Sequence, residues 1–382
     1  MVSEYRRLLS VPKGSVFLFG VRGVGKSTWA RSNLPEAVRF DLLDERQYHD
    51  LLADPGAFGE ALAALPAGSQ VVIDEVQRLP QLLNEVHRFI EERRLRFALL
   101  GSSARKLKTA GTNLLAGRAT WKTLFPLTPT ELGDDFDLER ALRFGTIPLV
   151  WVADDPAERL RSYARLYLSE EVKAEALVRN LPGFARFLPV AGLFHGQVIN
   201  VASLARDAGV ARTTVLGYLD ILEDTLLVTR LRAFEGRLRV RERRHPKLYW
   251  VDPGLARAVK RQVGPVAMEE RGHLLEGWAL SLLRAYSEIH PLFDEIYYWA
   301  SANVEVDFLM ARGAEHLALE VKSSARISSP QLAGLRAAAS LPSITRRILV
   351  YTGTLERRTA DGIELWPVGT FVERLACGSL WP

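Results

Sequence analysis

Short apolar runs alternate with helical patterns over the first 130 residues of the chain. Residues Ser15–Phe19 predict a buried strand, and so do Val71–Ile73 and Phe97–Leu100. Trp121–Phe125 is a fourth candidate strand, and Leu82–Arg93 carries apolar residues at helical spacing. Strands that are apolar throughout and separated by helices are typical of a parallel sheet covered on both faces. We therefore expect an α/β domain over residues 1–130.

The pattern becomes helical after Pro126 and Pro129, two prolines that mark a boundary. Residues 131–195 are rich in Leu, Arg and Ala, and we expect them to form a helical lid subdomain. Residues 201–222 then predict a short helix ended by Gly209 and a second helix after a tight turn. This order is the layout of a helix-turn-helix.

Two strand-like segments, 225–234 and 237–250, follow around Glu235-Gly236, so a winged helix-turn-helix is expected over residues 196–256. The wing is basic, with eight Lys or Arg against two Glu between residues 230 and 247. Such a cluster is typical of a nucleic-acid surface, and a solvated charged hairpin is the alternative. The eight are Arg230, Arg232, Arg237, Arg239, Arg241, Arg243, Arg244 and Lys247.

The last third of the chain mixes helical and strand patterns in an order that predicts a separate α/β domain over residues 257–382. The predicted helices cover 272–286 and 331–339, and the predicted strands cover 296–299, 305–310, 317–321 and 347–351. The whole chain is therefore expected to be α/β, with a helical lid and a winged helix between two sheet domains.

Composition narrows the class of protein. The chain has 382 residues, of which 48% are hydrophobic and 25% charged, as in ordinary globular proteins. Its single cysteine, Cys377, excludes a disulfide framework within one chain and a cysteine zinc site. Apolar stretches are too short for a membrane span and no signal peptide is recognisable, so we expect a cytoplasmic protein.

The strongest motif is Gly20-Val21-Arg22-Gly23-Val24-Gly25-Lys26-Ser27, which matches the phosphate-binding pattern G-x-x-x-x-G-K-S. Its glycines let backbone N–H groups converge on phosphates, and the following helix adds positive partial charge. Lys26 is expected on the β- and γ-phosphates of ATP and Ser27 on Mg²⁺. The predicted cofactor-binding residues are Gly20, Gly23, Val24, Gly25, Lys26, Ser27 and Thr28.

A second half of the site follows in the expected order. The apolar run ending at Ile73 is followed by Asp74 and Glu75. We expect Asp74 to hold Mg²⁺ with Ser27, and Glu75 to polarise the attacking water. A strand followed by a solvated acidic helix cap is the alternative interpretation.

Two further polar positions are candidates for the same site. Ser103, with Ser102 before it, follows the strand ending at Leu100, where a γ-phosphate sensor belongs. Arg118 precedes the next strand and is a candidate arginine finger acting across a subunit interface, with Arg105 as a weaker competitor. An ordinary surface arginine is the alternative for Arg118.

Together these motifs resemble the prokaryotic AAA-type (AAA+) ATPases that carry a C-terminal domain of unknown function. The resemblance implies an AAA+ fold, then a winged helix, then a restriction-endonuclease-like domain of the PD-(D/E)XK type. The family's usual Asn or Thr sensor is a Ser here. The matching segments are the phosphate loop, Asp74–Gln77, Gly101–Ala104, Leu115–Ala119, Val201–Leu227, Lys247–Leu255 and Leu274–Lys322.

A second candidate site lies in the last third. Asp307 and the sequence Glu320-Val321-Lys322 fall on two predicted strands, and Glu276 falls on the helix before them. Alternation along a strand puts Glu320 and Lys322 on one face. Asp307 and Glu320 are candidate ligands of a second metal, with Lys322 beside the attacking hydroxide and Glu276 completing the shell. A cross-strand ion pair is the alternative.

Candidate DNA contacts lie on the second helix and the wing. Arg212, Thr213 and Thr214 open the predicted recognition helix, and the wing arginines Arg237, Arg239 and Arg241 are expected to follow the phosphate backbone. Winged helices also dock onto proteins, which is the competing interpretation.

The sequence therefore predicts a DNA-dependent ATPase, using ATP and Mg²⁺. We expect a homo-oligomer, such as a hexameric ring, that acts as a helicase or branch-migration motor on branched or broken DNA. Metal-dependent DNA cleavage by the last domain is an extension of this hypothesis. The alternatives are a nucleotide-dependent switch that binds a protein partner, with an inactive nuclease-like domain, and an ATP-gated nuclease effector.

Overall fold

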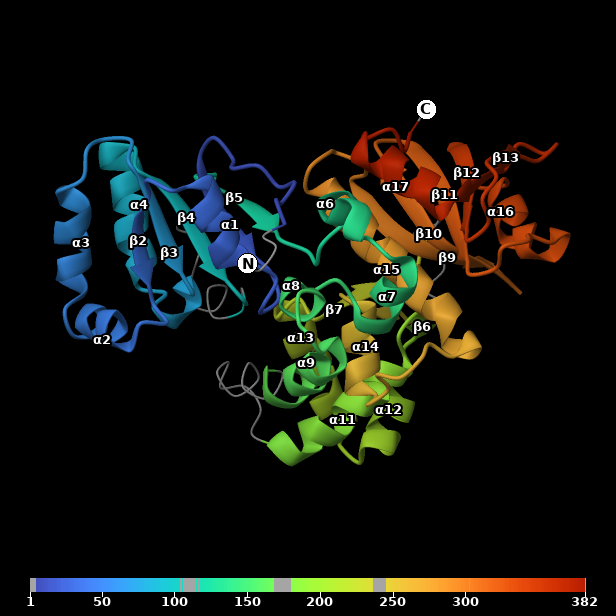
Figure 1. Ribbon diagram of the computed structural model, residues 1–382, viewed down its shortest axis with the longest axis horizontal. Coiled ribbons are helices and arrows are strands. Elements are labelled where there is room, and N and C mark those ends of the chain that lie inside the picture. Colours follow the sequence, from blue (N-terminus) through green and yellow to red (C-terminus); the bar gives the residue numbers. More distant parts are fainter. Residues whose placement is uncertain are drawn as a thin grey trace.

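The structure is a computed structural model that describes residues 5–103, 105, 115, 117–167, 180–235, 245–301 and 303–381. Figure 1 shows a blue sheet unit on one side, an orange-to-red sheet unit on the other, and green helices between and below them. Within the described ranges, no helix is long and apolar enough to cross a membrane.

The N-terminal sheet contains five parallel strands in the order β2-β3-β4-β1-β5. The parallel sheet expected from the sequence is thus confirmed, although β2 was not predicted because this edge strand is mostly polar or exposed. The strands are β1 (Ser15–Phe19), β2 (Val38–Asp41), β3 (Gln70–Asp74), β4 (Arg96–Gly101) and β5 (Ala119–Thr123).

Helices cover both faces of this sheet. Phe17, Ile73 and Leu99 point to the face covered by α2 (Glu45–Ala53), α3 (Pro55–Ala63) and α4 (Leu82–Arg93). Alternate residues such as Leu18 and Val72 point to the other face, which α1 (Lys26–Asn33) covers. The core on that second face continues without a break into the helices of the middle region.

The middle region is mainly helical and contains a small antiparallel sheet of order β6-β8-β7. A single left-handed residue, Gly209 with φ 63°, ends α12 and allows the tight turn into α13. Its helices are α6 (Pro129–Leu132), α7 (Leu138–Phe144), α8 (Pro148–Trp151), α9 (Pro156–Ser162), the π-helix η4 (Tyr163–Tyr167), α11 (Leu181–Leu193), α12 (Val201–Ala208), α13 (Arg212–Asp224) and α14 (Pro253–Val259). Its strands are β6 (Gln197–Val198), β7 (Val228–Leu231) and β8 (Lys247–Trp250).

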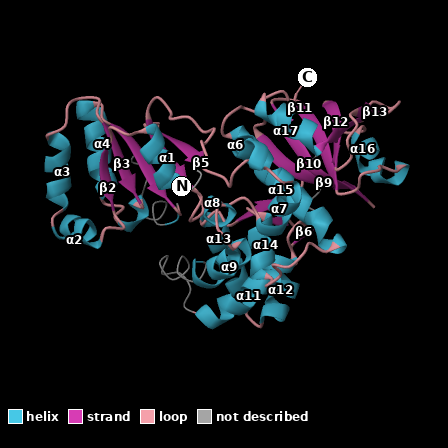
Figure 2. Ribbon diagram, viewed as in Figure 1, coloured by secondary structure: helices cyan, strands magenta, loops and turns pink. Residues whose placement is uncertain are grey.

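The C-terminal region is a mixed sheet of order β13-β14-β12-β11-β10-β9. Strands β9, β10 and β11 are antiparallel neighbours, whereas β11, β12 and β14 run parallel. Figure 2 shows these strands as the magenta sheet with α15 and α17 against it. The elements are α15 (Met268–Ser287), β9 (Glu295–Ser301), β10 (Val304–Arg312), β11 (Glu315–Lys322), α16 (Ala333–Ala338), β12 (Ile344–Tyr351), β13 (Arg357–Arg358), β14 (Glu364–Pro367) and α17 (Val368–Ala376).

Short 3-10 turns complete the chain, at η1 (Val76–Arg78), η3 (Gly133–Asp135) and η5 (Ser329–Leu332). The N-terminal and C-terminal sheets are linked at the edge of β5. Glu288, which follows α15, accepts a hydrogen bond from the Thr123 N–H at 3.1 Å, and its carbonyl accepts one from Lys122 Nζ at 2.6 Å. These two bonds join β5, an edge strand of the N-terminal sheet, to the end of α15.

Candidate functional site

The phosphate loop connects β1 to α1. Gly23 and Gly25 adopt positive φ values of 75° and 93°, which only glycine takes without strain. The Lys26 side chain is buried and its ammonium donates to the Gly20 carbonyl at 2.8 Å. At Gly20 a Cβ atom would lie 2.5 Å from the Leu124 carbonyl, so the loop has no room for a side chain there. The predicted phosphate loop therefore has the required backbone shape.

Asp74 at the end of β3 lies beside Ser27 at the start of α1, close enough for the Ser27 hydroxyl to act on the pKa of the Asp74 carboxyl. Burial raises the pKa of the Asp74 carboxyl, while the Ser27 hydroxyl and Lys26 act in the opposite direction. A hydroxyl and a carboxylate at a phosphate loop are hard oxygen ligands, which suit Mg²⁺. The residues present thus fit the cation that the motif implies.

Glu75 has a left-handed backbone, with φ 55° and ψ 44°. Its carboxylate accepts a hydrogen bond from the buried Gln77 amide, which also donates to Ser102 Oγ at 3.0 Å. The Ser102 hydroxyl lies 3.4 Å from the same carboxylate. A Cβ at Gly101 would lie 2.5 Å from Gln77 Oε1, so glycine there leaves space for this network. Sequence reasoning missed Gln77, because only the fold brings it to Ser102.

The other two catalytic candidates, Ser103 and Arg118, form contacts outside the Asp74–Glu75 pair. Ser103 is fully buried and its hydroxyl accepts the Arg105 N–H at 3.2 Å, so it is Ser102 that contacts Glu75. Arg105 also forms an ion pair with Asp224 on α13 at 3.0 Å. Arg118 forms an ion pair with Glu91 on α4 of the same chain. A role for Arg118 between subunits stays a prediction.

Residues of the lid contact the phosphate loop directly. The Leu149 N–H on α8 donates to the Gly23 carbonyl at 3.3 Å, and the Tyr163 hydroxyl donates to the Arg22 carbonyl at 2.8 Å. Arg7 reaches the loop from the N-terminal side, where it donates to the Val24 carbonyl at 2.7 Å. The Leu149 and Tyr163 bonds join the phosphate loop to the helical region.

The residues of the second candidate site lie on a helix and two strands, as the sequence predicted. Asp307 lies on β10, Glu320 and Lys322 on β11, and Glu276 on α15. The Asp307 N–H donates to Glu320 Oε2 at 3.3 Å, and Lys322 forms an ion pair with Glu320. Burial, followed by the carboxylates of Glu276 and Glu320, raises the pKa of Asp307 well above its usual value. All three carboxylates are buried.

Three residues that sequence reasoning missed complete this cluster. Lys247 on β8 is buried, and its ammonium lies 3.0 Å from Glu276 Oε1 and 3.8 Å from Asp307 Oδ1. It also forms an ion pair with Glu305, and the Tyr249 hydroxyl donates to Glu276. Burial alone would raise the pKa of Glu276, but His273, Lys247 and Tyr249 lower it to about 2.

The basic segment is therefore less exposed than its sequence indicated. Lys247 lies inside the carboxylate cluster, and Arg230 forms ion pairs with Asp220 at 2.8 Å and with Glu223. The prediction that all eight basic residues form one surface is wrong for these two, whereas Arg232 is exposed. Five of the eight fall outside the described residues, namely Arg237, Arg239, Arg241, Arg243 and Arg244.

The start of α13 is the accessible part of the predicted DNA-binding helix. Arg212 and Thr213 are exposed and Thr214 is half-buried, whereas Val215 and Leu219 pack in the core. Leu216 on the outer face is 46% exposed. These positions remain candidate partner contacts.

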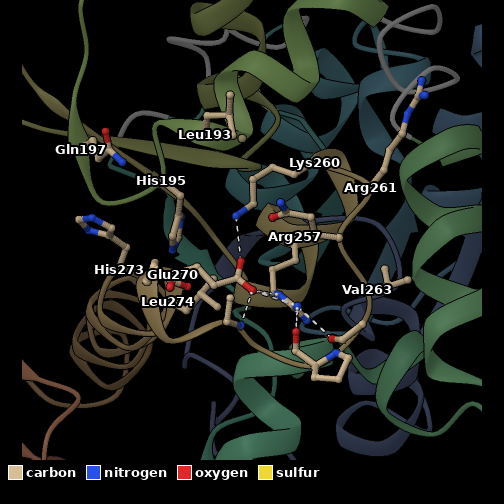
Figure 3. Close-up of a pocket in the computed structure, with 16 residues that line it drawn as sticks. Leu193, His195, Gln197, Arg257, Lys260, Arg261, Val263, Glu270, His273 and Leu274 are labelled. Atoms are coloured by element: carbon tan, nitrogen blue, oxygen red, sulfur yellow. Dashed lines mark hydrogen bonds and ion pairs between the residues drawn. The ribbon is translucent and has the colours of Figure 1, made fainter.

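A cavity of about 610 Å³ lies between α11, α14 and the start of α15. Figure 3 shows Glu270 bonded to both Lys260 and Arg257, with His195 and His273 on the opposite side. Arg257 is buried and also donates to the carbonyls of Arg143, Gly264 and Pro265. The bonds of Arg257 to Gly264 and Pro265 thus hold the loop between α14 and α15 in place.

Family models match three consecutive parts of the chain. One described as an AAA domain matches residues 12–133. Two described as domains of unknown function follow, DUF8612 over residues 135–265 and DUF4143 over residues 271–371. The AAA match and the phosphate loop agree that the first domain is of the AAA type, and the AAA match implies nucleotide binding.

Proteins of two mycobacteria are similar over most of their length. Both Uncharacterized protein Mb2031c of Mycobacterium bovis and Uncharacterized protein Rv2008c of Mycobacterium tuberculosis are 30% identical over 351 residues, covering 88% of this chain and 76% of theirs. The structure of the Aeropyrum pernix ORC1 protein in complex with DNA has 13% identity and a TM-score of 0.32, over 66% of this chain and 87% of that one. That score is too low to carry an argument. The identity to the mycobacterial proteins shows that the chain belongs to their family, and its first domain is an AAA domain.

Proposed function

We propose that the protein hydrolyses ATP and couples the nucleotide state to DNA held by α12 and α13. The observation that carries the ATPase part is the meeting of Ser27 with Asp74, beside the phosphate loop and next to Glu75. Lys26 would leave the Gly20 carbonyl for the phosphates. Mg²⁺ held by Ser27 and Asp74 would neutralise charge on the phosphates, and Glu75 would orient the attacking water.

The DNA part is supported by the layout of the middle region. Helix α11, strand β6, helices α12 and α13, and strands β7 and β8 follow in the order of a winged helix, with Gly209 at the turn. The first residues of α13, Arg212 and Thr213, are exposed and would reach phosphates or base edges. The arginines 237, 239 and 241 between β7 and β8 would add phosphate contacts.

A chain of contacts supports coupling between the two parts. Glu75 accepts a hydrogen bond from Gln77, and Gln77 donates to Ser102. Ser103, the next residue, accepts the Arg105 N–H at 3.2 Å. The Arg105 ion pair with Asp224, at 3.0 Å, ends this chain at the last residue of α13. Loss of the γ-phosphate and of the attacking water beside Glu75 would thus be passed to the helix that is proposed to bind DNA.

Two observations favour a second candidate function, a nucleotide-dependent switch that binds a protein partner. Arg230 and Lys247 are used in internal ion pairs, which leaves less positive charge free for DNA. Leu216 exposes apolar surface on α13, where it would pack against a protein partner. Either function is compatible with a homo-oligomer in which Arg118 acts across the subunit interface. DNA cleavage is not part of the proposed function, because the ammonium of Lys247 lies among the carboxylates of the C-terminal cluster.

The test is ATP hydrolysis measured with duplex, single-stranded and four-way-junction DNA and without DNA, at two salt concentrations. The proposed function requires that at least one DNA form stimulates turnover, and that binding falls with salt at a log–log slope of about −0.9 per phosphate contact. Lys26→Ala is the control that removes nucleotide-dependent signal. If no DNA form changes the rate, DNA coupling is wrong and the protein-partner switch replaces it.

A further inference from the structure

The buried carboxylates of Glu276, Asp307 and Glu320 converge as they would around a divalent cation, yet they surround a lysine. Lys247 extends from β8 into the C-terminal unit, with its ammonium 3.0 Å from Glu276 and 3.8 Å from Asp307. Its side chain is only 4% exposed. A cation so deeply buried is held only where carboxylates compensate for its lost hydration.

The remaining oxygens of the cluster also face protein groups. Asp307 Oδ2 accepts the Val321 N–H at 2.8 Å. Glu320 Oε2 accepts the Asp307 N–H at 3.3 Å, and Glu320 Oε1 pairs with Lys322. Glu276 Oε2 faces His273 Nδ1 at 3.8 Å. Four of the six oxygens of these three carboxylates thus have a hydrogen bond or a close ion pair, and the other two lie 3.8 Å from Lys247 Nζ and His273 Nδ1.

This arrangement does not fit a bound divalent metal. Mg²⁺ and similar ions require several oxygens at about 2.0–2.6 Å, with lone pairs directed at the ion. Within the part of the chain that the structure describes, no group of three or more His, Cys, Asp or Glu side chains is arranged to hold a metal ion. The oxygens of Glu276 and Asp307 that a metal would use are those that face Lys247.

We propose that Lys247 is a built-in cation that takes the place of a divalent metal ion, so that the C-terminal cluster is a metal-free joint between β8 and the last sheet. Two further contacts belong to the joint: the ion pair of Lys247 with Glu305, and its position 5.6 Å from the centre of the Tyr298 ring. Removal of the ammonium leaves carboxylates without compensation, and a small divalent cation then becomes their favourable partner. The C-terminal unit therefore does not cleave phosphodiesters with a metal while Lys247 is in place.

The test is Mn²⁺ binding, followed by electron paramagnetic resonance and by the melting temperature, in nucleotide-free protein. The expected result is that wild type and Asp307→Asn bind Mn²⁺ equally weakly, while Lys247→Met gains one site and melts several degrees higher with Mn²⁺ than without. Adding Asp307→Asn to Lys247→Met should remove that gain. Lys260→Met is the matched control, because Lys260 is a half-buried lysine whose ion pair in the described part of the chain is with a single carboxylate, Glu270, at 3.0 Å.

Two results would overturn the proposal. One is Mn²⁺ binding by wild type that Asp307→Asn abolishes, which would mean that metal displaces Lys247. The other is a folded Lys247→Met protein that gains no Mn²⁺ site. If Lys247→Met does not fold, the comparison of wild type with Asp307→Asn decides by itself: equal weak binding supports the built-in cation, and a difference rejects it.

Discussion

The side-chain amide of Gln77 donates a hydrogen bond to the carboxylate of Glu75, the residue next to Asp74, which is the proposed Mg²⁺ ligand. The same amide donates to Ser102 at the end of β4, so the carboxylate is held from the neighbouring strand. Glu75 is therefore oriented by a residue that lies outside the phosphate loop.

Replacing Gln77 with Met should lower kcat for ATP hydrolysis roughly tenfold and leave KM within about twofold. The reason is that Met fills the same space but cannot hold the Glu75 carboxylate, whereas nucleotide binding uses the phosphate loop. Ser102→Ala should have a smaller effect, because its hydroxyl lies 3.4 Å from the carboxylate. Steady-state kinetics together with the melting temperature measure this, and an unchanged kcat in folded Gln77→Met would reject the positioning role.

Glu75→Gln should bind ATP as wild type does and hydrolyse it at least about 100-fold more slowly, because the amide cannot take up a proton from the attacking water. Lys26→Ala should lose nucleotide affinity instead. A fluorescent ATP analogue measures binding and phosphate release measures turnover. Glu92→Gln, an exposed change on α4, is the control. Normal turnover by Glu75→Gln would mean that another residue is the general base.

Asp224→Asn should keep basal ATP hydrolysis but lose most of the stimulation by DNA. This change removes the ion pair with Arg105, which joins α13 to the segment after β4. Asp207→Asn on α12 is the matched control, because its ion pair is with the exposed neighbouring residue Arg206 and lies within α12 itself. Equal stimulation of Asp224→Asn and wild type would exclude this coupling route.

Acid should destabilise the protein through His195. Burial lowers the pKa of this imidazole from 6.5 to about 3, and its Nδ1 accepts the Trp250 N–H at 3.1 Å. Below pH 6.5 the unfolded chain takes up a proton that the folded chain refuses, so stability is full above that pH and is lost as the pH falls toward 3. The free energy of unfolding should fall by about 2 kcal/mol between pH 7 and pH 5 from this residue.

Urea denaturation at the two pH values measures the effect of His195. His195→Asn keeps an acceptor for the Trp250 N–H and should flatten the dependence on pH, although the protein becomes less stable overall. His49→Asn is the control because its side chain is 67% exposed. A pH dependence of His195→Asn identical to that of wild type would contradict the assignment.

Two glycine substitutions should have opposite effects. Gly254→Ala on α14 should destabilise the protein by about 1–3 kcal/mol or more, because its Cβ would lie 2.1 Å from the Phe144 backbone. Gly217→Ala on α13 meets nothing within 4 Å and should stabilise the helix by up to about 1 kcal/mol. Thermal unfolding measures both, and a neutral Gly254→Ala would mean that α7 and α14 separate easily.

Much of the fold follows from local patterns in the chain. Helix α4 has the predicted bounds, Leu82–Arg93, because its apolar positions recur at helical spacing. Strand β1 has its predicted bounds, Ser15–Phe19, because it is apolar and buried on both faces. Strand β2 was missed, since an edge strand with exposed Val38 and Asp41 carries no such pattern. No prediction was made for β13, β14, α14 or α17.

The sequence by itself determined the phosphate loop, because its glycines and Lys26 act through contiguous backbone, and it placed Asp74 and Glu75 at a strand end. Only the tertiary structure decided what Lys247 and Gln77 do. In the sequence Lys247 is one more cation in a basic run, and its burial depends on β8 packing against β10 and α15. A contact between residues distant in the chain leaves no local pattern, because hydrophobic periodicity reports which face is buried and not which side chain it meets.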